Sequence, residues 1–160
     1  MTYQVNPIGT VHSTMMDFSI EIQEPYRPGL KQLAQFSHVN VFWWAHENDN
    51  AEARQNLQNR PGYAQGATVG VFASRAELRP NPIAVTTCPI IAVDEANGIV
   101  RLAWIDAHDG TPVLDLKPYI PLSDRVRDVR VADWFANWPA YQEDAATFEF
   151  DPAMFEPYED

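Results

Sequence analysis

The stretch Asn81–Asp106, NPIAVTTCPIIAVDEANGIVRLAWID, decides the fold. It contains two runs rich in Val, Ile and Thr, residue types that favour strands. Asn97 and Gly98 lie between the runs, and an Asn-Gly pair in that place is typical of a hairpin with a type I′ turn. Pro82 and Pro89 are expected to bound or bend the first strand, because proline cannot donate a ladder hydrogen bond. The stretch therefore predicts two antiparallel strands.

Further short strand patterns flank this hairpin on both sides. Strands are expected within residues 3–13, 19–23, 37–46, 67–75 and 108–121. Helical turns are expected near 27–36 and 131–138, the latter with Trp134, Phe135 and Trp138 packed inward, and a polar helix or loop at 48–60. Short strands with only small helices between them predict a mainly β (α+β) fold. We expect a small antiparallel β-barrel with a few short peripheral helices, not a Rossmann fold.

The composition indicates a soluble domain that needs no covalent staple. A chain of 160 residues can bury a core without disulfides or metal. Residues 1–20 lack the basic start and apolar block of a secretory signal. The longest apolar run near the middle, VFWWA, is far shorter than the ~20 residues of a membrane helix. Cys88 is the only cysteine. We expect a cytoplasmic protein with no membrane segment.

The charge is concentrated near the end of the sequence. The net charge is −11, and the last 18 residues carry seven acids and no Lys or Arg. We therefore predict a barrel domain over 1–142 and an acidic C-terminal tail over 143–160. Nucleic-acid-binding proteins usually carry a basic stripe. The nearest candidate, DRVRDVRVADW at 124–134, alternates arginines with acids and is typical of a solvated face. The charge balance therefore disfavours tRNA as a partner.

Two arginines lie beside a proline-stiffened corner. Arg75 and Arg79 precede Pro80-Asn81-Pro82, and prolines exclude helix from the residues before them. Guanidinium groups keep their charge and match carboxylate or phosphate in a planar fork. A rigid turn holding two such groups is a candidate anion clamp. Alternatively, each arginine pairs with a surface acid such as Glu77, and the prolines only make a tight corner.

A second group of polar residues lies at 105–121. Asp106, Asp109 and Asp115 are interleaved with His108, Lys117 and Tyr119. Carboxylates there could orient a ribose hydroxyl, face a ligand cation or act as a base. The alternative is local turn chemistry, which is favoured for Asp109 because Asp-Gly is a common turn pair.

Histidines provide one further candidate but no metal site. His46 ends the strand pattern VFWWA, at a place where sites are often built, although a capping or surface role is the simpler interpretation. The four histidines (His12, His38, His46 and His108) show no ligand spacing and no Cys pair assists them, so no metal is expected.

Four blocks in this order resemble the TrmO/TsaA-like family: PIGTVHS, GLKQLAQFSHVNVFWWAH, GVFASRAELRPNPIAVT and DGTPVLDLKPYIP. The resemblance spans residues 7 to about 124. It implies a small β-barrel that binds S-adenosylmethionine and forms a homodimer with the cofactor near the subunit interface. It also implies methyl transfer to N6 of threonylcarbamoyladenosine in the tRNA anticodon loop.

The resemblance also implies site residues. The family's cofactor contacts fall here on His46, Glu47, Arg75 and the loop Ile105, Asp106, Ala107 and His108. Arg79 and Asn81 match the same motif and are assigned to cofactor binding with them. Asp115, Lys117 and Tyr119 match the last block and are the candidate catalytic residues.

Three departures from the family pattern leave the activity open. Glu77 places a negative charge between the arginines, and Ala84 stands where the family has glycine. An early cofactor-contacting loop has no clear counterpart, since TMMDF stands near its place, and the acidic tail stands where some members have an additional domain. The acceptor could be the tRNA adenosine or a small metabolite. A second hypothesis is a non-catalytic module that binds S-adenosylmethionine or a related adenosine ligand and regulates a partner.

Overall fold

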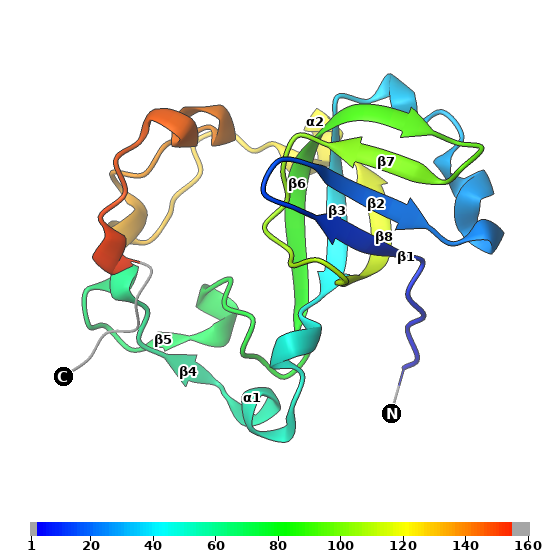
Figure 1. Ribbon diagram of the computed structural model, residues 1–160. Coiled ribbons are helices and arrows are strands. Elements are labelled where there is room, and N and C mark those ends of the chain that lie inside the picture. Colours follow the sequence, from blue (N-terminus) through cyan, green and yellow to red (C-terminus); the bar gives the residue numbers. More distant parts are fainter. Residues whose placement is uncertain (1–2, 155–160) are drawn as a thin grey trace.

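Six strands close into an antiparallel barrel in the order β1-β2-β7-β6-β3-β8, in a computed structural model that describes residues 3–154 (Figure 1). Their bounds are β1 Gly9–Ser13, β2 Phe18–Ile22, β3 His38–Trp44, β6 Ile83–Asp94, β7 Ile99–Leu102 and β8 Pro112–Pro118. A separate two-stranded sheet contains β4 Gln58–Asn59 and β5 Val69–Gly70. The predicted small barrel is confirmed.

The helices are short and lie outside the barrel. The α-helices are α1 Ala51–Gln55 and α2 Pro121–Asp124. The 3₁₀ turns are η1 Glu24–Leu30, η2 Leu33–Gln35, η3 His46–Asn48, η4 Gly62–Ala64, η5 Val71–Ala73, η6 Asp133–Phe135, η7 Gln142–Thr147 and η8 Pro152–Met154. None of these helices is long and apolar enough to cross a membrane.

The barrel core follows from the alternation of side chains along each strand. In β3 the residues Val39, Val41 and Trp43 are buried while the intervening residues are half-buried. Alternate residues of a strand face opposite sides, so one set fills the interior. The other strands contribute Val11, Ile20, Ile22, Cys88, Val100, Leu102 and Val113 to the same cluster. Pairing of Gly9 with Val113 joins β1 to β8 and closes the barrel.

The predicted hairpin is present as β6 and β7, but its turn is not type I′. Such a turn needs positive φ at both central residues, and only Gly98 has it, at 78°. The Asp94 carboxylate accepts hydrogen bonds from the backbone and side-chain nitrogens of Asn97 at 3.1 and 2.7 Å. Gly98 N donates to Asp94 O at 2.8 Å. The Asp94 side chain thus stabilises a longer loop in which only the glycine is left-handed.

The expected strand at 67–75 is mostly wrong. Only Val69–Gly70 pairs as β5, and the chain then turns through η5. The carbonyl oxygen of Val71 accepts from the side chains of Ser74 and Arg79. These local donors satisfy the Val71 carbonyl, which therefore needs no partner from a neighbouring strand.

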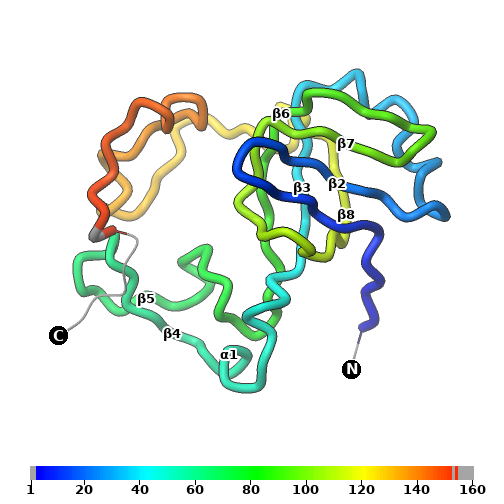
Figure 2. The backbone as a smooth tube through the Cα atoms, viewed as in Figure 1, coloured from blue at the N-terminus to red at the C-terminus, as the bar shows by residue number. Residues whose placement is uncertain are grey.

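Residues 131–154, here called the C-terminal arm, leave the barrel and return beside the β4–β5 region (Figure 2). The expected inward-facing helix at 131–138 is only the short turn η6, and its aromatic side chains are half-buried. They belong to a cluster of rings from the arm and the β4–β5 region. Most pairs in it pack edge to face and the Tyr63–Phe135 pair is tilted by 33°; the members are Tyr63, Trp134, Phe135, Trp138, Phe148 and Phe150. The arm therefore has a small aromatic core outside the barrel. Residues 155–160, the end of the predicted tail, lie outside the described residues.

Candidate functional site

A cleft of about 1080 Å³ lies between the outer face of the barrel and the C-terminal arm. Residues Ile83–Thr87 of β6 line its barrel side, and Tyr141, Gln142 and Glu143 line its arm side. Gln142 Nε2 donates to the Thr87 carbonyl oxygen at 2.9 Å, which fastens the arm across the cleft. The cleft is therefore bounded by segments far apart in the sequence.

The two arginines of the proline corner both line this cleft. Arg75 Nη2 donates to the Val85 carbonyl oxygen at 2.6 Å. Arg79 Nη2 donates to the carbonyl oxygens of Val71 and, at 3.2 Å, Ser74. Backbone carbonyls hold both guanidinium groups in place and leave their other N–H donors for a ligand.

Glu77 does not pair with either arginine. It accepts from Asn48 Nδ2 at 2.5 Å, and within residues 3–154 no ion pair joins it to Arg75 or Arg79. The alternative interpretation of the corner, in which each arginine is neutralised by a surface acid, is therefore wrong.

A smaller pocket adjoins the cleft and contains four of the predicted cofactor residues. His46, Glu47, Asp106 and His108 line it, and it shares Trp43, Glu77 and Asp106 with the cleft. His108 Nδ1 lies 2.7 Å from Glu47 Oε2, so η3 and the loop before β8 are joined at this point. The structure therefore brings the two arginines and these four residues to one continuous site.

Asp106 lies where the two pockets meet, and a hydrogen-bond chain fixes its carboxylate. Trp43 Nε1 donates to Thr86 Oγ1 at 2.9 Å, and Thr86 Oγ1 donates to Asp106 Oδ1. Its neighbours Ile105 and Ala107 are only 5% and 3% exposed and belong to the barrel core. Of the predicted loop, only Asp106 and His108 can present side chains to a ligand, and the other two can offer backbone groups alone.

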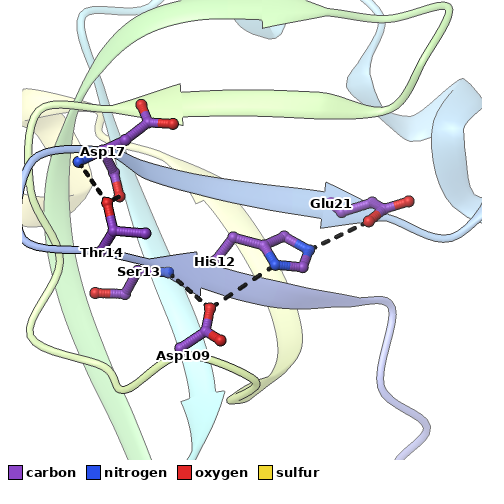
Figure 3. Close-up of polar contacts among 6 residues, drawn as sticks. All are labelled: His12, Ser13, Thr14, Asp17, Glu21 and Asp109. Atoms are coloured by element: carbon purple, nitrogen blue, oxygen red, sulfur yellow. Dashed lines mark hydrogen bonds and ion pairs between the residues drawn. The ribbon is translucent and has the colours of Figure 1, made fainter.

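Asp109 holds this loop against β1. Figure 3 shows its carboxylate between the backbone nitrogen of Ser13, 3.0 Å away, and the ring of His12, whose Nδ1 lies 3.8 Å away. His12 Nε2 also lies 3.2 Å from Glu21 Oε2 on β2. Asp109 lines neither pocket and has a structural role. The predicted turn at Asp109-Gly110 is present, closed by Thr111 N donating to His108 O at 3.2 Å, but the Asp109 side chain bonds Ser13 of β1 and not its own backbone.

The remaining predicted site residues divide into two groups. Tyr119 lines the cleft, with its ring centroid 6.2 Å from that of His38. Asp115 and Lys117 form an exposed ion pair of 2.7 Å and line neither pocket. Asn81 is exposed at the proline corner and also lines neither pocket.

The profile of the family described as tRNA-methyltransferase O N-terminal domain (TrmO_N) matches residues 3–125. The chain belongs to this family. The chain superimposes on the crystal structure of TrmO from Pseudomonas aeruginosa with a TM-score of 0.62 and 32% identity, covering 81% of this chain and 61% of that one. The chain thus spans about three-fifths of the solved TrmO chain.

Curated relatives of this TrmO_N chain carry related names. A protein of Pyrococcus horikoshii named a probable S-adenosyl-L-methionine-binding protein is 36% identical over 116 residues, 72% of this chain and 81% of that protein. A Pseudomonas aeruginosa protein named a putative S-adenosylmethionine-dependent methyltransferase, RcsF, is 36% identical over 148 residues, 81% and 62% of the two chains. The human tRNA (adenine(37)-N6)-methyltransferase is 39% identical over 100 residues, 62% of this chain and 22% of that protein.

Sequence reasoning missed several residues of the TrmO_N site. Trp43 and Thr86 are buried and appear in the sequence as ordinary strand residues, so nothing marked them as supports for Asp106. Gln142 is the last residue of the predicted barrel domain, and nothing in the sequence marked its contact with β6. Across residues 3–154 no cluster of three or more His, Cys, Asp or Glu side chains is arranged to hold a metal ion.

Proposed function

We propose that this chain binds S-adenosylmethionine in the continuous site and acts as a methyltransferase dependent on it. The observation that carries the proposal is the convergence of Arg75 and Asp106 on one cleft of a TrmO_N barrel. The names of the relatives from Pyrococcus and Pseudomonas support the same ligand.

The groups that line the site fit the parts of this cofactor. Its methionine carboxylate suits the free donors of Arg75 and Arg79, since guanidinium–carboxylate pairs form strong charge-assisted bonds. Its sulfonium is a cation, which suits the carboxylate of Asp106. The apolar side chains of Ile83 and Val85, which line the cleft, provide wall area for an adenine ring.

S-adenosylmethionine, when bound, supplies a methyl group activated by the positive sulfur. The protein has to hold an acceptor nitrogen in line with the methyl group and the sulfur, and keep this alignment fixed. Such alignment can contribute ~7–11 kcal/mol to lowering the barrier. The backbone-held arginines and the Trp43–Thr86–Asp106 chain provide fixed contacts of this kind.

The finer assignments rest on the resemblance. We propose N6 of threonylcarbamoyladenosine in the tRNA anticodon loop as the named acceptor, with a small metabolite as the other branch. The human relative's name supports the tRNA branch, whereas the net charge of −11 does not. We also propose a cytoplasmic homodimer, with catalytic candidates Asp115, Lys117 and Tyr119. Because Asp115 and Lys117 lie outside both pockets, Tyr119 is the best placed of the three.

A second candidate function is a non-catalytic S-adenosylmethionine-binding module. The departures at Glu77 and Ala84 favour it, because both residues line the cleft. Calorimetric titration with S-adenosylmethionine tests binding, and incubation with labelled cofactor and a mixed pool of tRNA and metabolites tests transfer. Binding with labelled product supports the enzyme, binding without product supports the module, and no binding contradicts both.

A further inference from the structure

The cleft carries a second pair of arginines that the cofactor assignment does not use. Arg125 and Arg127 follow α2 and line the same cleft as Arg75 and Arg79. Within residues 3–154 none of these four guanidinium groups has a carboxylate partner.

Two arginines outside the cleft also lack a carboxylate partner: Arg27 donates to the backbone carbonyl oxygens of Ile22 and Ala96, and Arg130 forms no ion pair within residues 3–154. Two others have such a partner. Arg54 forms an ion pair of 2.5 Å with Asp49, and Arg101 forms one of 2.9 Å with Asp17. The chain has twice as many acids as bases, 22 against 11. The cleft is set apart because it gathers four arginines without a carboxylate partner, an arrangement that suits anions supplied from outside.

The acids of the cleft are largely engaged with neutral donors. Glu77 accepts from Asn48 and Asp106 from Thr86. Asp124 accepts from the side chain of Asn40 at 3.1 Å and from the backbone nitrogen of Ile120 at 2.7 Å. Because these carboxylates bond neutral donors, they do not neutralise the arginines of the cleft. Asp128 and Glu143 are the other acids that line the cleft.

The segment that carries the second arginine pair is anchored to the barrel. Asn40 Oδ1 accepts from Thr87 Oγ1 at 2.7 Å, so Asp124, Asn40 and Thr87 connect the end of α2 to β6. Thr87 lies two residues beyond Val85, the residue whose carbonyl oxygen holds Arg75. Two residues of a strand span about 7 Å. Arg75 and the segment that carries the second arginine pair are therefore attached to one strand a short distance apart.

We propose that Arg125 and Arg127 form a phosphate-binding subsite for the methyl acceptor. The inference rests on the proposed function, in which the single carboxylate of S-adenosylmethionine occupies the first arginine pair. A second anion must then come from the acceptor, and phosphate matches the guanidinium fork. Tyr119 and Tyr141 line the same cleft, and Tyr141 is 58% exposed, so aromatic faces for a base are present beside the subsite.

Four arginines and five acids line the cleft, so its lining is less acidic than the chain as a whole, which has 11 bases and 22 acids. Phosphate contacts fix the position and register of a nucleic acid without reading its sequence. The same chemistry would fix a phosphorylated nucleotide. The experiment below uses tRNA and adenosine 5′-monophosphate as separate probes to distinguish these two sources of phosphate.

The test compares the double variant Arg125→Gln/Arg127→Gln with the single variant Arg130→Gln. Arg130 is an exposed arginine of the same segment that does not line the cleft, so it is the matched control. Binding of unfractionated tRNA and of adenosine 5′-monophosphate is measured by fluorescence anisotropy at several salt concentrations, with and without S-adenosylmethionine. Cofactor affinity is measured separately by calorimetry.

We expect the double variant to bind at least one probe about tenfold or more weakly, since each lost bond is charge-assisted. For tRNA the slope of log affinity against log salt should fall by about 1.5, as two fewer phosphates are contacted. Arg130→Gln should change affinity by less than about twofold, and cofactor affinity should stay as in the wild type. Three outcomes would each overturn the proposal. The two variants could lose probe affinity equally, the double variant could lose cofactor affinity in place of probe affinity, or the wild type could bind neither probe. Cofactor binding is measured in a separate experiment. A wild-type protein that binds a probe but not S-adenosylmethionine would contradict the proposed function and not the phosphate subsite.

Discussion

The indole nitrogen of Trp43 donates a 2.9 Å hydrogen bond to Oγ1 of Thr86, and both side chains are buried. The hydroxyl of Thr86 donates onward to Asp106, which lies where the cleft and the smaller pocket meet. A buried indole N–H needs an acceptor, and Thr86 provides it. Because this bond holds the Thr86 hydroxyl in place, the hydroxyl in turn holds the Asp106 carboxylate in place. The barrel core therefore sets the position of a charged group in the site.

Replacing Thr86 by Val keeps the volume of the side chain but removes both hydrogen bonds. The Trp43 N–H would be buried without a partner, so we expect a loss of about 1–3 kcal/mol in the free energy of unfolding. Urea denaturation followed by tryptophan fluorescence measures it. Thr86→Ser retains the hydroxyl and is the control. If Thr86→Ser loses stability and Thr86→Val does not, the methyl group, not the hydrogen-bond chain, supplies the stability.

Arg75→Ala removes a guanidinium that lines the cleft and is held by the Val85 carbonyl. We expect affinity for S-adenosylmethionine to fall by about 1.5–3 kcal/mol, the worth of a charge-assisted bond. Calorimetry measures the change, and Arg130→Ala, outside the cleft, controls for the loss of one positive charge. Unchanged affinity in Arg75→Ala would remove this residue from the cofactor site.

Gly98 and Gly110 both have left-handed backbone, with φ of 78° and 80°, but different surroundings. A Cβ at Gly98 would lie 2.7 Å from the backbone oxygen of Ile22 and 2.6 Å from Arg27 Nε, whereas a Cβ at Gly110 meets nothing within 4 Å. Each Ala variant pays the cost of left-handed backbone, about 1–2 kcal/mol. We expect Gly98→Ala to lose clearly more stability than Gly110→Ala in denaturant unfolding. Equal losses would mean that Ile22 and Arg27 move away from the added methyl group at no cost in stability.

The strands were largely predictable because the alternation of apolar and polar residues, and runs of β-branched residues, indicate directly which side chains are buried. The hairpin of β6 and β7 was predicted from the runs that flank Asn97-Gly98, while its turn type was not, because the Asp94 side chain selects a longer loop. The segment 67–75 has strand composition, yet the side chains of Ser74 and Arg79 satisfy the Val71 carbonyl locally. Such side-chain-to-backbone contacts depend on residues several positions away and leave no periodic signal.

The site was predictable to the extent that its residues carry charge in marked motifs. Arg75 and Asp106 were identified in this way and do converge on the cleft. Ile105 and Ala107 matched the same motif, but the alternation of the loop buries their side chains in the core. Thr86 has no charge and no motif, so its role emerges only from its partners in three dimensions.

Cys88 is fully buried, and burial together with the charge of Asp106 raises the pKa of its thiol to about 12 from an ordinary value of 9.0. Only the thiolate reacts with alkylating agents. At pH 8 we therefore expect the thiolate fraction of the folded protein to be about a thousandfold below that of the unfolded chain. Iodoacetamide labelling followed by mass spectrometry, with and without guanidinium chloride, measures the difference. Between pH 8 and pH 10 the labelling rate of the folded protein should rise about a hundredfold, against about tenfold for a thiol of ordinary pKa, and rapid labelling at pH 8 would contradict the raised pKa.

The acidic side chains of the C-terminal arm should oppose any RNA that enters the cleft. Glu143 lines the cleft and Glu149 lies further along the same arm, so Glu143→Gln/Glu149→Gln lowers the negative charge there without removing the aromatic rings that hold the arm. We expect tRNA affinity to rise about threefold at 50 mM salt and the gain to fade at 500 mM, where screening is short-ranged. The variant Glu24→Gln/Glu52→Gln changes the net charge equally on residues outside the cleft and should give a smaller gain. If both variants gain equally, the arm acts only through the net charge of the chain, and if neither gains, it does not screen the cleft at all.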